Sequence, residues 1–185
     1  MLKVTDFFCG CGGLSQGFKE AGFKIKQGID IDKSFLTTYS KNFNEAEILN
    51  IDLGENKFLE KVSKTDIIVA GPPCQGFSLT GPRNIDDPRN KLYLSVFKAI
   101  KKIKPKSFLI ENVRGLMSMW KGQVFEEIIK RFKNTDYEIS YKLLNSADYG
   151  VPQIRYRVFI VGLRKDLNKK FDFPKGEFNK NNYIS

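Results

Sequence analysis

The chain has 185 residues, of which 41% are hydrophobic, and this is enough for one domain with a sizeable core. No apolar run is long enough to span a bilayer, and the start MLKVTDFF lacks the layout of a signal peptide, so we expect a soluble intracellular protein. Lys and Arg number 31 against 21 Asp and Glu, a net charge of +10. This excess favours a polyanionic partner such as nucleic acid, although Lys-rich surfaces also arise without one.

The chain has no histidine and three cysteines, Cys9, Cys11 and Cys74. These numbers exclude Ser-His-Asp and Cys-His catalysis and leave too few ligands for a tetrahedral zinc site, so no metal is expected. Cys9 and Cys11 are too close in sequence to form a useful cross-link. We expect both to be small buried side chains in a reducing compartment.

Strand and helix patterns alternate through the first 113 residues. Residues 3–8 (KVTDFF) predict a buried strand that ends in the turn GCGG, and a helix is expected at about 14–22. The further elements are strands at 24–29, 46–49, 65–71 and 107–113 and helices at about 33–43 and 91–103. Residues 71–90 are rich in Gly and Pro, and a loop of this length is usually functional.

The pattern changes after residue 113. A helix is expected at about 122–133, and strands at 137–145 and 155–163 alternate enough to predict an antiparallel pair at the sheet edge. The alternation before them predicts an α/β fold, with a mostly parallel sheet, right-handed crossovers and helices on both faces. Ligands bind such sheets beyond the carboxyl ends of the strands. No repeat or linker divides the chain.

A glycine-rich turn follows the first predicted strand. Phe8, Gly10, Gly12 and Gly13 form F-x-G-x-G-G, in which glycines let a ligand approach the backbone closely. The spacing differs from the G-x-G-x-x-G that is typical of dinucleotide-binding folds. Tight packing alone is the alternative explanation for such a turn.

Acidic residues follow the second and third predicted strands. Asp30 could accept hydrogen bonds from both hydroxyls of a ribose, and Asp52 could accept one from an adenine amino group. Alternatively, Asp30 and Asp32 are surface turn acids and Asp52 is a helix N-cap.

Two candidate catalytic groups follow the fourth and fifth predicted strands. Cys74 lies in GPPCQGFS, where Pro72 and Pro73 restrict the backbone and hold the thiol in place. Glu111 lies in the sequence Glu-Asn-Val at the end of the strand 107–113. A lone loop cysteine is more often inert than catalytic, so its interpretation depends on this carboxyl partner at the same edge of the sheet.

In chain order, FFCGCGG, GIDID, NIDL, GPPCQGFS, ENV and QIRYR resemble the motifs of the cytosine-C5 DNA methyltransferase family. The resemblance covers nearly all of residues 1–163, with the family's order and intervals, and PCQ, ENV and Q-x-R-x-R are its most specific parts. It implies a Rossmann-like, S-adenosylmethionine-dependent catalytic domain over 1–163. The implied reaction is methyl transfer to C5 of cytosine in DNA, as in bacterial restriction–modification systems.

The resemblance also implies roles for the catalytic residues. Cytosine C5 is a poor nucleophile until a thiolate adds to C6, and Cys74 would be that thiolate. Glu111 would hydrogen-bond the ring N3 and the exocyclic amine, a role that favours a raised pKa. Arg155 and Arg157 would support the flipped base and the catalytic loop; solvated basic side chains on a strand are the alternative.

The remaining assignments concern the cofactor and the DNA. The cofactor-binding residues implied by the resemblance are Phe8, Gly10, Cys11, Gly12, Gly13, Asp30, Ile31, Asp52, Leu53, Pro73 and Leu92. The residues expected to contact DNA or support the site are Gln75, Ser78, Arg83, Arg89, Asn112 and Gln153. C5 is inaccessible inside a stacked duplex, so the base must be extruded, and the loop 78–90 is expected to act as a lid over the DNA.

Members of the family continue into a target-recognition domain and two further motifs, the last of which completes the cofactor pocket. Residues 164–185, which include FDFPKGEF, resemble the linker or tail before that domain. We therefore expect base-specific readout to need a second polypeptide or a C-terminal half. The 185 residues alone are expected to bind the cofactor weakly and to methylate little.

Three alternatives remain at this point. The chain could be a tRNA cytosine-C5 methyltransferase, or an inactive truncated fragment that only binds cofactor. An NAD-dependent oxidoreductase is the least favoured, because the glycine spacing is wrong for it and PCQ and ENV would have no role. A DNA substrate would imply the bacterial cytoplasm, in association with the nucleoid.

Overall fold

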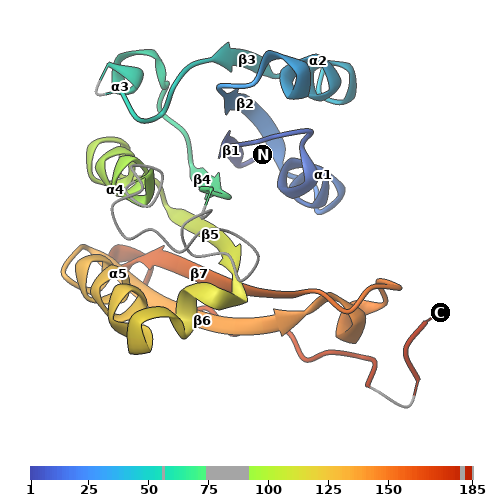
Figure 1. Ribbon diagram of the computed structural model, residues 1–185. Coiled ribbons are helices and arrows are strands. Elements are labelled where there is room, and N and C mark those ends of the chain that lie inside the picture. Colours follow the sequence, from blue (N-terminus) through green and yellow to red (C-terminus); the bar gives the residue numbers. More distant parts are fainter. Residues whose placement is uncertain (56, 74–91, 180–181, 185) are drawn as a thin grey trace.

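The computed structural model of the chain describes residues 1–55, 57–73, 92–179 and 182–184 (Figure 1). Seven strands form one sheet in the order β3-β2-β1-β4-β5-β7-β6. The strands are β1 (Lys3–Phe7), β2 (Lys24–Asp30), β3 (Glu47–Asn50), β4 (Ile67–Ala70), β5 (Ser107–Val113), β6 (Tyr137–Asn145) and β7 (Tyr156–Arg164). The α-helices are α1 (Gly13–Glu20), α2 (Lys33–Asn42), α3 (Phe58–Lys61), α4 (Leu92–Ile103) and α5 (Gln123–Lys133). Short 3₁₀ helices lie at Arg114–Met117, Met119–Gly122, Ser146–Tyr149 and Lys165–Leu167.

The predicted α/β architecture is confirmed. β1 pairs in parallel with β2 and β4, and the parallel arrangement continues to β3 on one side and β5 on the other. β7 pairs antiparallel with both β5 and β6, so the last two strands form the predicted antiparallel pair, with β6 at the edge. Each predicted element is present, with small shifts at its ends, and only α3 and the 3₁₀ helices were not predicted.

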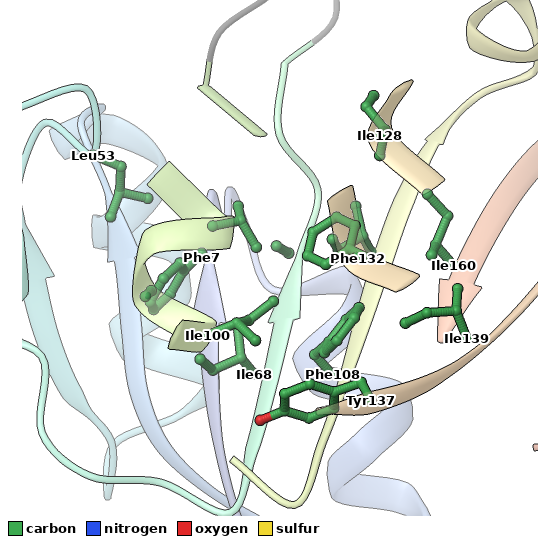
Figure 2. Packing of buried hydrophobic residues seen from close by; sticks show 14 of the residues in the cluster. Phe7, Leu53, Ile68, Ile100, Phe108, Ile128, Phe132, Tyr137, Ile139 and Ile160 are labelled. Carbon is green, nitrogen blue, oxygen red and sulfur yellow. The ribbon is translucent and has the colours of Figure 1, made fainter. Parts of the chain in front are cut away.

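Helices cover both faces of the sheet (Figure 1). On one face, α1 and α2 pack over a cluster that includes Val4, Val69 and Tyr39. On the other face, α3, α4 and α5 pack over a larger cluster that includes Phe7 and Phe108 (Figure 2). None of the described helices is long and apolar enough to cross a membrane; α4, the longest, has 12 residues.

The strand order positions a ligand site at the centre of the sheet. From β1 the chain moves to β2 and β3 on one side, and then returns to β4 and β5 on the other. The order of the strands thus reverses between β1 and β4, and sheets of this kind bind ligands at such a switch point, in the crevice outside the carboxyl ends of the strands. The glycine turn follows β1 and Gly71 follows β4, so both lie at this crevice.

The packing of Phe108 allows a test of the core. Phe108 on β5 is opposite Gly162 on β7, and its ring lies between those of Phe132 and Tyr137 (Figure 2). A Cβ atom on Gly162 would be 2.2 Å from the Phe108 ring. We expect Gly162→Ala to lower the free energy of unfolding by about 1–3 kcal/mol, since the ring can move only into a filled core.

Urea unfolding followed by circular dichroism measures this effect. Gly17→Ala is the matched control, because a Cβ there meets nothing within 4 Å and the residue lies inside α1. Alanine in a helix is favoured over glycine, so this control is expected to gain roughly 0.5–1 kcal/mol. Equal effects of the two substitutions would contradict the proposed packing of Phe108.

Candidate active site

The turn after β1 adopts a left-handed backbone at three positions. Phe8, Gly10 and Gly12 have φ values of 57°, 52° and 99°. A Cβ atom on Gly12 would be 2.3 Å from the ring of Phe43, so glycine lets α1 pack close to the end of α2. Gly13, the first residue of α1, has no atom within 4 Å of its Cβ position. Packing therefore explains Gly12, whereas the space beside Gly13 is open to a ligand.

The two cysteines of this turn differ in exposure. Cys9 is buried, as predicted, and burial raises the pKa of its thiol, so it stays protonated. Cys11 is exposed, and the prediction that it is a small buried side chain is wrong. The backbone turns at Gly10, between the two cysteines, and their spacing in the sequence does not reveal which of the two side chains the turn leaves exposed.

Asp30 at the end of β2 stabilises the glycine turn through a hydrogen bond. Its Oδ2 accepts a hydrogen bond of 2.9 Å from the Gly10 amide, and its Oδ1 accepts one of 3.0 Å from the Asp32 amide. Each carboxylate oxygen can accept a second bond, so ribose hydroxyls remain possible partners. Asp32 instead caps α2 through the amides of Ser34 and Phe35, which matches the alternative that it is a surface turn acid. These hydrogen bonds lower the pKa of Asp32.

Residues after β3 approach the start of α4. Asp52 is exposed and its Oδ1 accepts a 2.7 Å hydrogen bond from the Gly54 amide. Asp52 is not a helix N-cap, because Lys57 occupies that position of α3. The Leu92 side chain lies 3.5 Å from the Cβ position of Gly54, which brings these two segments together. The Leu53 side chain is 2% exposed and belongs to the core, so its backbone is what a ligand could contact.

Glu111 on β5 forms an ion pair with Arg157 on β7. In the antiparallel register Arg157 is opposite Val113, so Glu111, two residues earlier, projects from the same face of the sheet. The Arg157 Nε lies 2.8 Å from Glu111 Oε1, and the two side chains are 21% and 23% exposed. The other carboxyl oxygen, Oε2, lies 3.8 Å from the Cβ position of Gly71. The alternative that Arg157 is merely a solvated basic side chain is therefore wrong.

The electrostatic surroundings of Glu111 act in opposite directions. Burial raises the pKa of its carboxyl, whereas the charges of Arg157 and Arg155 lower it. Burial dominates, and the pKa lies above the ordinary value of a glutamate. The carboxyl thus holds its proton to a higher pH while Arg157 fixes its orientation.

Asn112 connects β5 to the chain after β4. Its side chain is 6% exposed, and Nδ2 donates a 3.2 Å hydrogen bond to the carbonyl of Pro72. Its Oδ1 accepts a 2.8 Å bond from the Val113 amide. Asn112 therefore fixes the backbone immediately before Pro73, the last described residue before the segment with Cys74.

Arg155 is positioned by a residue that the sequence analysis missed. Asn145 at the end of β6 is 3% exposed, and its Oδ1 accepts a 3.1 Å hydrogen bond from the Arg155 amide. The Asn145 Nδ2 donates to Asp148, which also accepts a 2.6 Å bond from the hydroxyl of Tyr183. The sequence signal for this role was an Asn as the last residue of the predicted strand 137–145. Gln153 is exposed, and its backbone N–H donates a hydrogen bond to the carbonyl of Val151.

The C-terminal segment packs against the end of the antiparallel pair. Ser140 on β6 donates a hydrogen bond to the Phe171 carbonyl, and the hydroxyl of Tyr149 donates to the Pro174 carbonyl. Gly176 packs closely on Asp148. Residues 165–179 thus lie on the domain, and Pro174 reaches the site itself.

A cavity of about 750 Å³ joins the two halves of the site. Phe8, Gly13 and Leu14 line it from the glycine turn, and Glu111, Arg155 and Arg157 line it from the antiparallel strands. Asp6, Gly71 and Pro174 complete much of the wall. Of the predicted cofactor residues that the structure describes, only Phe8 and Gly13 are in this lining. Those outside it are Gly10, Cys11, Gly12, Asp30, Ile31, Asp52, Leu53, Pro73 and Leu92. Ile31 is 64% exposed.

Asp6 on β1 is the most buried acidic residue that lines the cavity. It is fully buried, and its Oδ2 accepts a 2.7 Å hydrogen bond from the Ser15 hydroxyl, which also lies 2.7 Å from the hydroxyl of Tyr39. Its Oδ1 has no hydrogen-bond partner among the described residues. Burial raises the pKa of Asp6 to about 7. None of the sequence motifs pointed to Asp6.

Several predicted residues lie outside the described part of the chain. They are Cys74, Gln75, Ser78, Arg83 and Arg89, so the predicted thiol and the predicted lid over the DNA both stay predictions. Within the described residues, no three His, Cys, Asp or Glu side chains are grouped to hold a metal ion.

Comparison with known proteins adds to this geometry. The family model for C-5 cytosine-specific DNA methylases matches residues 2–185. Type II methyltransferase M.FnuDI of Fusobacterium nucleatum is 45% identical over 175 residues, which are 94% of this chain and 50% of the relative. Type II methyltransferase M.NgoPII of Neisseria gonorrhoeae is 38% identical over 176 residues, 95% of this chain and 52% of the relative.

A solved structure agrees with these relatives. The crystal structure of a DNA modification methyltransferase encoded within an E. coli prophage superposes with a TM-score of 0.79 at 33% identity. The superposition covers 93% of this chain and 49% of that structure. The chain thus spans about half the length of the curated relatives and of the solved structure that it matches.

Proposed function

Because the chain belongs to the C-5 cytosine-specific DNA methylase family, we propose that it carries the catalytic part of a DNA cytosine-C5 methyltransferase that uses S-adenosylmethionine. The observation that carries the proposal is the shared cavity, in which the glycine turn after β1 and the Glu111–Arg157 pair face the same space. A cofactor at the turn and a base at Glu111 would therefore be neighbours, as methyl transfer requires.

Glu111 and Arg157 would act on the cytosine ring. With Oε1 engaged by Arg157, Oε2 is the oxygen left to carry the proton and to contact ring N3. A hydrogen bond or proton at N3 withdraws electrons from the ring and makes C6 more electrophilic. The raised pKa of Glu111 supports this role, because it keeps the proton available nearer to neutral pH.

Cys74 would be the nucleophile that attacks C6. The hydrogen bond from Asn112 to Pro72 supports this proposal, since it fixes the chain shortly before the cysteine to the strand that carries Glu111. The thiolate forms a bond to C6 and C5 becomes nucleophilic. After C5 has gained the methyl group, loss of the C5 proton to a base breaks the C6–S bond and regenerates the thiolate.

The described residues fit the proposed cofactor. The open space beside Gly13, the carboxylate of Asp30 and the Asp6 oxygen that no described residue pairs offer room and acceptors to a ligand with hydroxyl and amino groups. When bound, the cofactor supplies a methyl group on a sulfonium centre. Phe8 would pack on the adenine ring, and Asp52 with the Leu53 backbone and Leu92 would border it beyond β3.

We also propose that DNA is the substrate and that these 185 residues need further protein for full activity. Support comes from the net charge of +10 and from relatives that are about twice as long. The added part would be either more of the same chain or a second polypeptide that reads the target sequence. The Type II names of the relatives suggest a restriction–modification system, which acts on DNA at the bacterial nucleoid.

Binding and methylation assays with the purified chain test this function. Calorimetry is expected to detect weak binding of S-adenosylhomocysteine and no binding of NAD. Methyl transfer by the chain alone is expected to be slight. Any transfer that is detected should be to duplex DNA and not to tRNA. Methylation confined to tRNA would overturn the proposed substrate, and binding of NAD alone would overturn the proposed cofactor. Efficient methylation of DNA by the chain alone would overturn the need for further protein.

A further inference from the structure

The C-terminal segment, residues 165–179 and 182–184, is held to the turn between β6 and β7. The backbone carbonyl of Asp148 in this turn accepts hydrogen bonds from the amides of Glu177 and Phe178, at 2.9 and 3.1 Å. These are contacts between backbones far apart in the sequence, so they fix the position of the segment relative to the sheet. The segment therefore lies against the antiparallel strands that carry part of the site.

Tyr183 joins this segment to the end of β6. Its hydroxyl donates a 2.6 Å hydrogen bond to Asp148 Oδ1 and accepts one of 3.1 Å from Asn145 Nδ2. The same Asn145 nitrogen donates to Asp148 Oδ1 at 3.2 Å. The three side chains thus form a closed triangle of hydrogen bonds, to which the C-terminal segment contributes the hydroxyl.

The polarity of this triangle orients the Asn145 amide. A carboxylate only accepts hydrogen bonds, so the Tyr183 hydroxyl donates to Asp148 and its oxygen is left to accept from Asn145. The nitrogen of the Asn145 amide must then point into the triangle, and Oδ1 points away from it, where it accepts the 3.1 Å bond from the Arg155 N–H. Because Asn145 is 3% exposed, water cannot readily replace these partners.

The direction of the Arg155 side chain depends on its backbone. Its N–H is held by Asn145, and its carbonyl accepts a 3.0 Å hydrogen bond from the Ser146 amide. Its guanidinium has no hydrogen bond or ion pair to a described residue, whereas that of Arg157 is fixed by Glu111. Arg155 nevertheless lines the cavity, and its charge acts on Glu111. The backbone contacts therefore decide where this charge lies.

We propose that Tyr183 is a positioning residue of the methyl-transfer site, which acts through Asn145 to hold the charge of Arg155 near Glu111. This inference rests on the proposed function, and it gives the C-terminal segment a role in catalysis. In sequence the segment resembles a linker or tail. A segment that only connected two domains would not need a hydroxyl that is matched to a buried asparagine.

Hydrogen exchange of the Arg155 amide, followed by NMR, tests the network in the chain alone. Tyr183→Phe keeps the ring and removes the hydroxyl, so the Asn145 amide loses one of the groups that orient it. The Arg155 N–H is expected to exchange roughly 3- to 10-fold faster, the effect of losing one ordinary hydrogen bond. Tyr141→Phe is the matched control, because Tyr141 is an exposed tyrosine on the strand of Asn145, with its ring on Phe125 and outside the cavity lining. Unchanged exchange in Tyr183→Phe would contradict the network.

A double-mutant cycle tests the effect on the reaction. Single-turnover methyl transfer to duplex DNA, with the further protein that full activity needs, is measured for the wild type, Tyr183→Phe, Arg155→Ala and the double variant. Tyr183→Phe should slow transfer roughly 3- to 10-fold in the wild-type background and leave binding of S-adenosylhomocysteine unchanged. In the Arg155→Ala background the same substitution should have no effect, because the side chain that it positions is absent. The control Tyr141→Phe should match the wild type.

The outcomes separate this role from a folding defect and from the proposed function. A defect in folding or in assembly would slow transfer equally in both backgrounds, and that result would overturn the role of Tyr183. A Tyr183→Phe rate equal to that of the wild type would do the same, and both results leave the proposed function intact. Absence of methyl transfer by the wild type would overturn the proposed function and this inference with it.

Discussion

Replacing Cys74 with alanine is expected to reduce methyl transfer by more than about 10³-fold, the order seen when an enzyme loses its covalent nucleophile. Without a thiolate, C6 stays sp² and C5 has no enamine with which to attack the methyl group. Binding of S-adenosylhomocysteine should be unchanged, because the cofactor contacts proposed here come from the turn after β1, from the ends of β2 and β3 and from Pro73 and Leu92, and none comes from the thiol. The measurement is single-turnover transfer of labelled methyl groups to duplex DNA, in the presence of whatever further protein full activity needs.

Thr37→Ala is the control for Cys74→Ala. Thr37 is an exposed residue of α2 with no proposed contact to the cofactor or the base, so its loss should leave the rate unchanged. A duplex with 5-fluorocytosine gives a second readout, because fluorine leaves no C5 proton to remove and the C6–S bond persists. The wild type and Thr37→Ala should form an adduct that survives denaturing electrophoresis, and Cys74→Ala should form none. An adduct with Cys74→Ala would show that another group is the nucleophile.

Glu111→Gln is expected to slow methyl transfer by about 10²- to 10⁴-fold, the usual contribution of a general acid. Glutamine keeps the size and one oxygen for Arg157 but has no proton to give to ring N3. Two features of the wild type should then disappear together. The first is the fall in the rate of methyl transfer as the pH rises through the raised pKa of Glu111, and the second is the ion pair between Glu111 and Arg157.

Glu127→Gln serves as the control for Glu111→Gln. Glu127 is an exposed acid on α5 whose partner is Arg131, one helical turn away, and such surface pairs contribute little. Its rate and pH profile should match those of the wild type. If Glu111→Gln retained full activity with an unchanged pH profile, the carboxyl would be a structural partner of Arg157 and the proposed chemistry would need another acid.

Local signals in the sequence determined the secondary structure of this protein. The strand Ser107–Val113 was predicted with its observed bounds, because the apolar run from Phe108 to Ile110 is a signal carried by adjacent residues. The glycine turn was likewise predicted from adjacent residues, and the family motifs pointed to Glu111, Arg155 and Arg157 as site residues without showing which of them pair. α3 was missed because four residues form too short a stretch to show a helical period.

The tertiary structure decided which side chains meet, since partners far apart in the sequence leave no local trace. The register of β5 and β7 joins Arg157 to Glu111, and the packing of α1 and α2 buries Asp6 with one oxygen satisfied and the other unpaired among the described residues. In the sequence, Asp6 is one residue of a predicted buried strand, and nothing local distinguishes it until its neighbours in space are known. The exposure of Cys11 and the contact from Asn112 to Pro72 depend in the same way on how distant segments fold together.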